Sequence, residues 1–165
     1  MATFLLRGTA IPTSGDLPRV GAPAPDATLT PADFNDRAVS SYAGWRVCNI
    51  FLSVDTGVCA ASIRTFAARC ADRPGVTVLH IAHDLPFAMK RFCGAEGLPN
   101  QVVLSTFRSK LPDAWGLRMA GGPFSGCCAR AVVVLDPDGV TRHTELVAEV
   151  GQEPNYDAAL AVLPA

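Results

Sequence analysis

The segment Val47–Ala82 reads VCNIFLSVDTGVCAASIRTFAARCADRPGVTVLHIA and predicts a strand, a helix and a second strand in succession. Residues Val47–Leu52 form a short, mostly apolar run, which is typical of a buried strand. After a break at Ser53–Gly57, apolar residues recur from Val58 to about Ala71 with the period of a helix. Val76–Ala82 is apolar again and predicts the second strand. This order favours a layered α/β fold in which helices pack on a sheet.

The flanking sequence continues the alternation. The further expected elements are an N-terminal hairpin at residues 3–14, strands at Thr28–Thr30, Val102–Leu104 and Ala131–Leu135, a hairpin partner at Val140–Val147, and helices from Pro86 to about Phe92 and from Asn155 to Leu163. The chain has 165 residues and no long linker, so one domain over residues 1–165 is expected. Its architecture should be a central mixed β-sheet with helices on both faces.

Composition excludes several classes of protein. Hydrophobic residues make up 49% of the chain, which is too many for a disordered protein. The 14 Lys and Arg residues against 15 Asp and Glu residues give a net charge of −1, so neither nucleic acid nor an anionic membrane is an expected partner. The small share of charged residues, 18%, and the near-neutral net charge favour a homo-oligomer that covers part of the surface.

The N-terminal sequence and the cysteines predict the compartment. The apolar residues Phe4–Leu6 are followed by Arg7, far short of the roughly 7–15 apolar residues of a signal peptide. No segment approaches the roughly 20 apolar residues of a membrane span. The protein is therefore predicted to be cytoplasmic, where six cysteines are not expected to form a disulfide framework. No Cys-x-x-Cys occurs, which excludes zinc-finger and thioredoxin-type motifs.

Cys59 is the first candidate for a reactive thiol. It follows a buried strand and the tight loop Asp55–Gly57, and it lies in the first turn of the predicted helix. The free backbone N–H groups of a helix N-terminus favour an anionic thiolate over a neutral thiol. The alternative is a core cysteine, since cysteine is among the most buried residue types.

Cys93 is the second candidate. It is expected just after the second helix, in a flexible segment where Lys90 and Arg91 would favour a thiolate. The alternative is a semi-exposed thiol at a helix end. Cys48 and Cys70 are interpreted as small core residues.

The segment before the strand at Ala131 carries two further candidates, Cys128 and Arg130. If that strand starts early, Cys128 shares a face with Arg130, which leaves a catalytic role for Cys128 open beside a structural one, whereas no role is predicted for Cys127. Arg130 is either the partner in an ordinary salt bridge or a fixed cation that stabilises a nearby thiolate.

The sequence motifs do not indicate a metal site or a nucleotide-binding loop. His80 and His83 would point to opposite faces of a strand, and His143 is isolated, so a metal site is not expected. The Gly121–Pro123 segment has neither the spacing of a dinucleotide loop nor the following Lys-Ser/Thr of a phosphate loop.

Taken together, these segments resemble the bacterial thiol peroxidases, which are atypical two-cysteine peroxiredoxins. The matching stretches are Phe51–Ser62, Asp84–Ala88, Arg91–Leu98, Leu104–Arg108, Ala129–Val134 and Tyr156–Leu163. The similarity covers nearly the whole chain. The set is specific because a Thr-x-x-Cys, a second cysteine 34 positions later and an Arg before a late strand occur together.

The resemblance implies a thioredoxin-like fold with an N-terminal β-hairpin, and a homodimer. It implies that Cys59 is the peroxidatic cysteine, Cys93 the resolving cysteine, Thr56 a hydrogen-bond donor to the peroxide and Arg130 the cation that holds the thiolate. Peroxide would convert Cys59 to a sulfenic acid, which condenses with Cys93 to an intrachain disulfide. A thioredoxin-like dithiol would then reduce that disulfide. The expected antioxidant chemistry needs no metal, haem or flavin cofactor.

The sequence departs from the family pattern at two positions. Leu52 stands where the family has a proline that shields the thiolate, and Gly57 stands where a second proline is usual. These changes predict a looser loop before Cys59. Two other functions remain open: a thiol-disulfide oxidoreductase, which would lack its usual Cys-x-x-Cys, and a non-enzymatic redox-sensing or interaction module that retains the fold.

Overall fold

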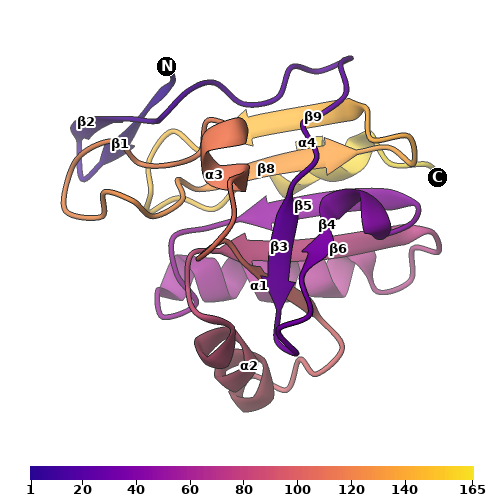
Figure 1. Cartoon of the computed structure of the whole chain (residues 1–165). Coiled ribbons are helices and arrows are strands. Elements are labelled where there is room, and N and C mark those ends of the chain that lie inside the picture. The colour runs from indigo at the N-terminus through magenta and orange to yellow at the C-terminus, as the bar shows by residue number, and fades with distance from the viewer.

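The computed structural model describes residues 1–165 and contains two sheets (Figure 1). A small antiparallel sheet is the hairpin of β1 (Thr3–Leu6) and β2 (Thr9–Pro12). The large sheet has the strand order β4-β3-β7-β6-β5-β8-β9. Its strands are β3 (Thr28–Pro31), β4 (Arg37–Ala38), β5 (Trp45–Ile50), β6 (Val76–Ala82), β7 (Val102–Ser105), β8 (Ala131–Leu135) and β9 (Thr141–Leu146).

The sheet is mixed, as predicted. β5, β6 and β7 run parallel, whereas β8 and β9 extend the sheet on the β5 side in antiparallel fashion and β3 does so on the β7 side. The central strands are covered on both faces, which is why their sequences are nearly continuous apolar runs. The carboxyl ends of β5 and β6 therefore lie side by side at one edge of the sheet.

Alternate residues of the central strands enter two different cores. Val47, Val78 and Val132 pack against α1 (Gly57–Cys70) and α4 (Tyr156–Ala161). Their neighbours Cys48, Leu79 and Ala131 face the other side, where α3 (Leu111–Ala114) and the following segment with Trp115 cover the sheet. In Figure 1, α1 lies behind the sheet and α3 in front of it.

A third core lies beyond the carboxyl ends of β5 and β6. It is built from the loop after β5, the first turns of α1, one side of α2 (Pro86–Ala95) and the N-terminal hairpin. Both Cys59 and Cys93 belong to it. The two candidate thiols thus share one apolar core although they lie on different helices.

The helix boundaries correct one prediction. α2 continues to Ala95, three residues beyond the expected end at Phe92. Cys93 is therefore inside the helix and only 7% exposed, not in a flexible segment after it. The packing of Met89 and Phe92 into the third core explains the extension, because the helix gains buried apolar contacts through its last turn.

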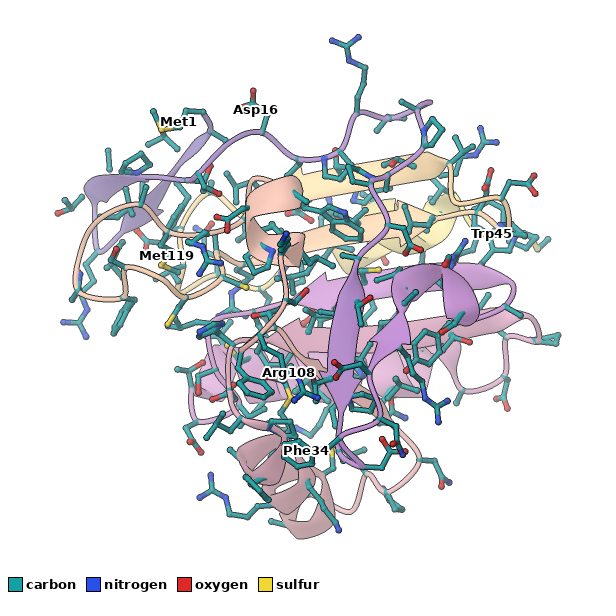
Figure 2. All side chains as sticks on the ribbon, in the orientation of Figure 1. Met1, Asp16, Phe34, Trp45, Arg108 and Met119 are labelled. Carbon is teal, nitrogen blue, oxygen red and sulfur yellow. The ribbon has the colours of Figure 1, made fainter.

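Three short elements carried no clear periodic signal and were not predicted: β4, α3 and a 3-10 turn at Val39–Ser41. Phe34 lies between β3 and β4 and is labelled in Figure 2; its ring packs on that of Phe87 in α2, with the ring centroids 4.9 Å apart.

None of the helices has the length and apolar composition needed to cross a membrane.

Candidate active site

The candidate site begins in the loop Ser53–Thr56, which leaves the carboxyl end of β5. Open α/β sheets commonly bind their ligands at this edge. Asp84, which follows β6, accepts hydrogen bonds from Ser53 Oγ at 2.7 Å and from the Val54 N–H at 3.0 Å. One carboxylate therefore ties the loop before α1 to the neighbouring strand end.

Thr56 is the N-cap residue of α1, but its hydroxyl does not cap the helix. A threonine at this position usually accepts a hydrogen bond from a backbone N–H two or three residues on. Instead, Thr56 Oγ1 lies 2.6 Å from Cys59 Sγ and 3.1 Å from the Ser53 carbonyl oxygen. With one proton, this hydroxyl accepts from a Cys59 thiol while donating to Ser53, or donates directly to a Cys59 thiolate.

Arg130 supplies the cation beside the same sulfur. Its Nη2 donates to Cys59 Sγ at 3.2 Å, and its Nε donates to the Val150 carbonyl oxygen at 3.1 Å. Nη1 is buried and has no partner. The guanidinium is thus placed to stabilise negative charge on sulfur, and it keeps the Nη1 amino group free for a further oxygen atom.

Two cavities adjoin this cluster, and Leu52, Thr56 and Phe124 line both of them. The first, of about 290 Å³, continues past His83, Asp84 and Cys127. The second, of about 260 Å³, is also lined by Arg130 and by residues of the hairpin and of the loop after β9. Cys59 itself is fully buried, so a small reactant would approach its sulfur from these cavities.

Cys93 is not poised as a thiolate. Burial raises the pKa of its thiol, and Arg91, expected to favour a thiolate there, is instead paired with Asp55 Oδ1 at 2.9 Å. A second ion pair joins α1 to α2, with Arg64 Nη1 2.6 Å from Glu96 Oε2. These pairs hold the helices that carry Cys59 and Cys93 against each other.

Comparisons with known proteins agree with this arrangement. The model of the Redoxin family matches residues 19–160, which is most of the chain. The chain belongs to the Redoxin family. Proteins named thiol peroxidase from Mycobacterium bovis and Mycobacterium tuberculosis are 52% identical to it over 166 residues, covering 100% of both chains in each case.

Two solved structures show the same fold. A peroxiredoxin-like protein from Aquifex aeolicus has a TM-score of 0.90 at 33% identity, covering 98% of this chain and 96% of that one. A thiol peroxidase from Chromobacterium violaceum has a TM-score of 0.91 at 24% identity, covering 98% and 95%, and supports the fold alone. The predicted thioredoxin-like peroxiredoxin fold is confirmed, as is the class of thiol-dependent peroxidase.

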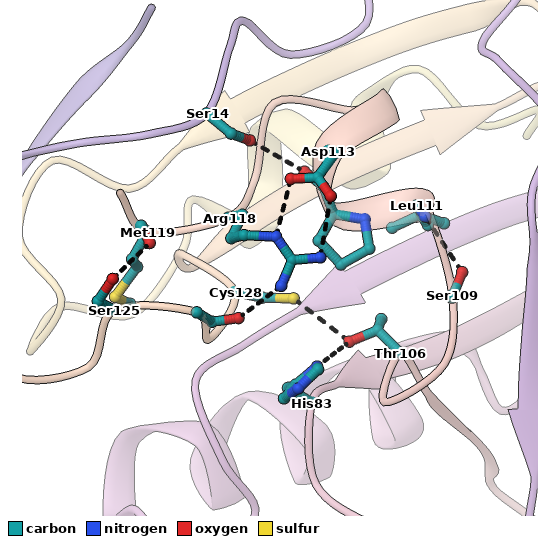
Figure 3. Close-up of polar contacts among 12 residues, drawn as sticks. Ser14, His83, Thr106, Ser109, Leu111, Asp113, Arg118, Met119, Ser125 and Cys128 are labelled. Atoms are coloured by element: carbon teal, nitrogen blue, oxygen red, sulfur yellow. Dashed lines mark hydrogen bonds and ion pairs between the residues drawn. The ribbon is translucent and has the colours of Figure 1, made fainter. Parts of the chain in front are cut away.

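The remaining cysteines of this Redoxin member are buried or half-buried, and burial raises the pKa values of their thiols. Burial raises the pKa of Cys48 and that of Cys128 to about 12, and Cys70 is also buried. Cys128 lies beside Thr106 Oγ1, which contacts His83 Nδ1 at 2.9 Å (Figure 3). Cys127 is half-buried, lines the larger cavity and has a pKa raised by burial.

Cys128 and Arg130 do not share a strand face, because the strand does not start early enough to include Cys128. β8 starts only at Ala131, so strand alternation does not reach residue 128. Cys128 packs into the core behind α3, whereas Arg130 turns to Cys59 on the other side. The backbone before β8 follows a turn that is fixed by Met119, whose N–H donates to the Cys127 carbonyl oxygen at 2.9 Å.

The histidines do not form a metal site. His80 is buried between Asn49 and Gln101, and His83 contacts Thr106. No group of three or more His, Cys, Asp or Glu side chains is arranged to hold a metal ion.

Sequence reasoning missed the residues that hold the reacting groups in place. Asp84 had one available signal, since it follows β6 at the same sheet edge as the loop after β5. Val150 and Glu149 had none, because they reach the site only through the tertiary contacts of a loop with no periodic pattern.

Proposed function

We propose that in this thiol-dependent peroxidase Cys59 is the peroxidatic cysteine, Cys93 the resolving cysteine, and Thr56 and Arg130 the groups that activate sulfur and peroxide. The observation that supports it best is the convergence on one sulfur: Thr56 Oγ1 at 2.6 Å and Arg130 Nη2 at 3.2 Å from Cys59 Sγ. A structural core cysteine has no need of two polar partners.

In the first step, the Cys59 thiolate attacks one oxygen of a hydroperoxide and breaks the O–O bond. Sulfur is oxidised to a sulfenic acid, and the other oxygen leaves as water or an alcohol after taking up a proton. Arg130 stabilises the thiolate through Nη2, and its free Nη1 is positioned to donate to the peroxide. Preorganised donors of this kind act most strongly in a buried site.

In the second step, the Cys93 thiol attacks the sulfenic sulfur, water leaves, and a Cys59–Cys93 disulfide forms. A disulfide requires Cα atoms within about 7 Å, and Cys59 and Cys93 lie in two separate helices, so we expect local unwinding to accompany this step. A thioredoxin-like dithiol then reduces the disulfide by exchange and is itself oxidised. The neutral, buried Cys93 thiol fits a residue that waits for the sulfenic acid rather than reacting with peroxide.

Three further predictions belong to this proposal: a single functional domain over residues 1–165, a homodimer and a cytoplasmic location. Exposed apolar side chains at Leu85, Phe87 and Phe124 are compatible with a covered surface near the site. Sedimentation of the reduced protein measures the oligomeric state directly.

Replacing the two cysteines one at a time tests the proposal. Cys59→Ser should abolish peroxide-dependent NADPH consumption coupled through thioredoxin and its reductase. Cys93→Ser should retain a single peroxide turnover and then stop, with one oxygen on Cys59 by mass spectrometry after one equivalent of peroxide. Cys48→Ala, at a buried cysteine outside the site, is the control and should keep turnover.

Persisting turnover in Cys59→Ser would contradict the assignment. A reactive Cys59 that fails to consume peroxide would instead favour the redox-sensing module. Turnover of a disulfide substrate without peroxide would favour the oxidoreductase.

A further inference from the structure

We propose that Glu149 and the N-terminal hairpin are positioning elements for Arg130, which they orient toward the Cys59 sulfur by fixing the Val150 carbonyl. This inference rests on the proposed role of Arg130 and adds a residue that lies more than 85 positions from Cys59 in the sequence. It also assigns a function to the hairpin, which lies entirely outside the region matched by the Redoxin family model.

The orientation of Arg130 depends on few contacts. Its hydrogen-bond partners are the Cys59 sulfur and the Val150 carbonyl oxygen, and no carboxylate is among them. A planar guanidinium is oriented when two of its edges are fixed. The Val150 carbonyl, 3.1 Å from Nε, is therefore the protein group that sets the direction in which Nη1 and Nη2 point.

Val150 is in turn held by the hairpin. Its N–H donates to the Leu5 carbonyl oxygen at 2.9 Å, and the Leu5 N–H donates to the Ala148 carbonyl oxygen at 2.7 Å. Residues 148–150 thus pair with β1 like a short extra strand. Figure 1 shows the hairpin at the end of the molecule where the loops before β8 and after β9 also lie.

Glu149 closes this pairing from the other side. Its carboxylate accepts hydrogen bonds from the Arg7 N–H at 3.0 Å and the Gly8 N–H at 3.2 Å. Arg7 and Gly8 are the two central residues of the hairpin turn, with φ of 51° and 80°. A two-residue turn of this kind favours Asn or Gly at its first position, so Arg7 adopts it at a conformational cost that the Glu149 contact offsets.

The same segments form a wall of the reaction cavity. The cavity of about 260 Å³ that contains Arg130 and Thr56 is also lined by Leu6, Arg7, Glu149 and Val150. A shift of the hairpin would therefore move both the guanidinium and the space that the peroxide enters. Misplacement of a reacting group by about 1 Å costs on the order of 100-fold in rate, so a partial loss of this support should be measurable.

The test is a double-mutant cycle between Glu149 and Arg130, read on the peroxide step. Glu149→Ala should lower the second-order rate constant for oxidation of Cys59, measured by rapid mixing, by on the order of 10-fold. In an Arg130→Met background, Glu149→Ala should cause a much smaller loss, because the group that it positions is absent and only the effect of the hairpin on the cavity remains. Glu149→Gln keeps one acceptor oxygen and should retain most of the rate.

Two controls separate positioning from general damage. Reduction of the Cys59–Cys93 disulfide by dithiol should be unchanged in Glu149→Ala, since Arg130 is proposed to act on the peroxide step. Glu153→Ala removes a carboxylate whose partner is Tyr156, outside this chain of contacts, and should leave the peroxide step unchanged.

Several outcomes would overturn the inference. They are an undiminished rate in Glu149→Ala, a loss of equal size with and without Arg130, or a parallel loss in the disulfide-reduction step. If Arg130→Met alone kept the full rate of peroxide reduction, the proposed function of Arg130 would fail first. The inference and the proposal on which it rests can therefore fail separately.

Discussion

Thr56 gives up a helix-capping hydrogen bond for a contact with the candidate reactive sulfur. An N-cap hydroxyl that bonds the helix backbone stabilises a helix by about 1 kcal/mol, and Thr56 forgoes this bond to contact the Cys59 sulfur. The backbone N–H groups of the first turn then remain available to a thiolate at Cys59. A break in a local rule at this point is expected of a reactive site.

Leu52 is the residue at which this chain departs most from the resemblance, and the structure makes the departure testable. Its side chain lines both cavities, and its N–H donates to no other group of the protein. Leu52→Pro therefore loses no hydrogen bond while fixing φ. We expect it to accelerate the peroxide step by on the order of 10-fold through better placement of the loop, without changing disulfide reduction.

Rapid mixing with peroxide and, separately, with reduced thioredoxin measures the two steps. Leu52→Ala is the matched control, because it opens the same space without fixing the backbone. A peroxide step that is slowed or unaffected in Leu52→Pro would show that the pocket is already adapted to leucine.

At the scale of elements, two ion pairs on either side of the two thiols join the segment around α1 to the segment around α2. Asp55 and Arg64 lie on either side of Cys59, and they pair with Arg91 and Glu96, which lie on either side of Cys93. The pairs stabilise the helical, reduced state. Since the proposed disulfide step involves local unwinding around both cysteines, these pairs would also oppose that step.

Removing the Asp55–Arg91 pair should therefore speed disulfide formation after Cys59 is oxidised. Exposed ion pairs contribute about 0–1 kcal/mol, so the double variant Asp55→Asn/Arg91→Met should be faster by roughly two- to five-fold. Acid quenching followed by mass spectrometry measures the Cys59–Cys93 link against time. The charge-exchanged variant Asp55→Arg/Arg91→Asp should restore the parent rate of disulfide formation. If it forms the disulfide as fast as the Asp55→Asn/Arg91→Met variant, the ion pair does not oppose this step.

For the whole molecule, a neutral histidine buried in the sheet links stability to pH. His80 lies between Asn49 Nδ2 at 3.1 Å and Gln101 Oε1 at 3.0 Å. Since the Asn49 amide donates to Nδ1, the ring carries its proton on Nε2. Desolvation by burial lowers the pKa of His80 from 6.5 to about 4, so the folded protein keeps this ring neutral where the unfolded chain protonates it.

The sign of the pH effect follows from proton uptake. Between pH 6.5 and about 4 the unfolded state binds the additional proton, so the free energy of unfolding falls as pH falls through this window. The full effect is on the order of 3 kcal/mol. Urea denaturation of the reduced protein at several pH values should show this slope, and His80→Gln should reduce it.

Burial also lowers the pKa values of His83 and His143, so a smaller slope of the same sign should remain in His80→Gln. His83→Gln is the comparison variant, because His83 is less buried and should contribute less. An unchanged slope in His80→Gln would assign the acid sensitivity to other groups.

The sequence by itself determined the parts of this protein whose signals are local. The apolar runs and the helical period between Val47 and Ala82 predicted β5, α1 and β6, and they placed Cys59 in the first helical turn. The hairpin partner expected at Val140–Val147 is likewise confirmed by the antiparallel pairing of β8 with β9. Periodicity carries such features because each depends on residues a few positions apart.

Only the tertiary structure decided which distant groups meet at the sulfur. Arg130 lies 71 positions from Cys59 and contacts it because β8 pairs beside β5, and no local pattern distinguishes this from a surface salt bridge. Cys93 was expected in a flexible segment but is buried, since packing of α2 on the third core extends that helix. Asp84 and Glu149 act through backbone N–H groups of other segments. Such contacts arise only when the sheet order has brought those segments together, which one-dimensional spacing does not encode.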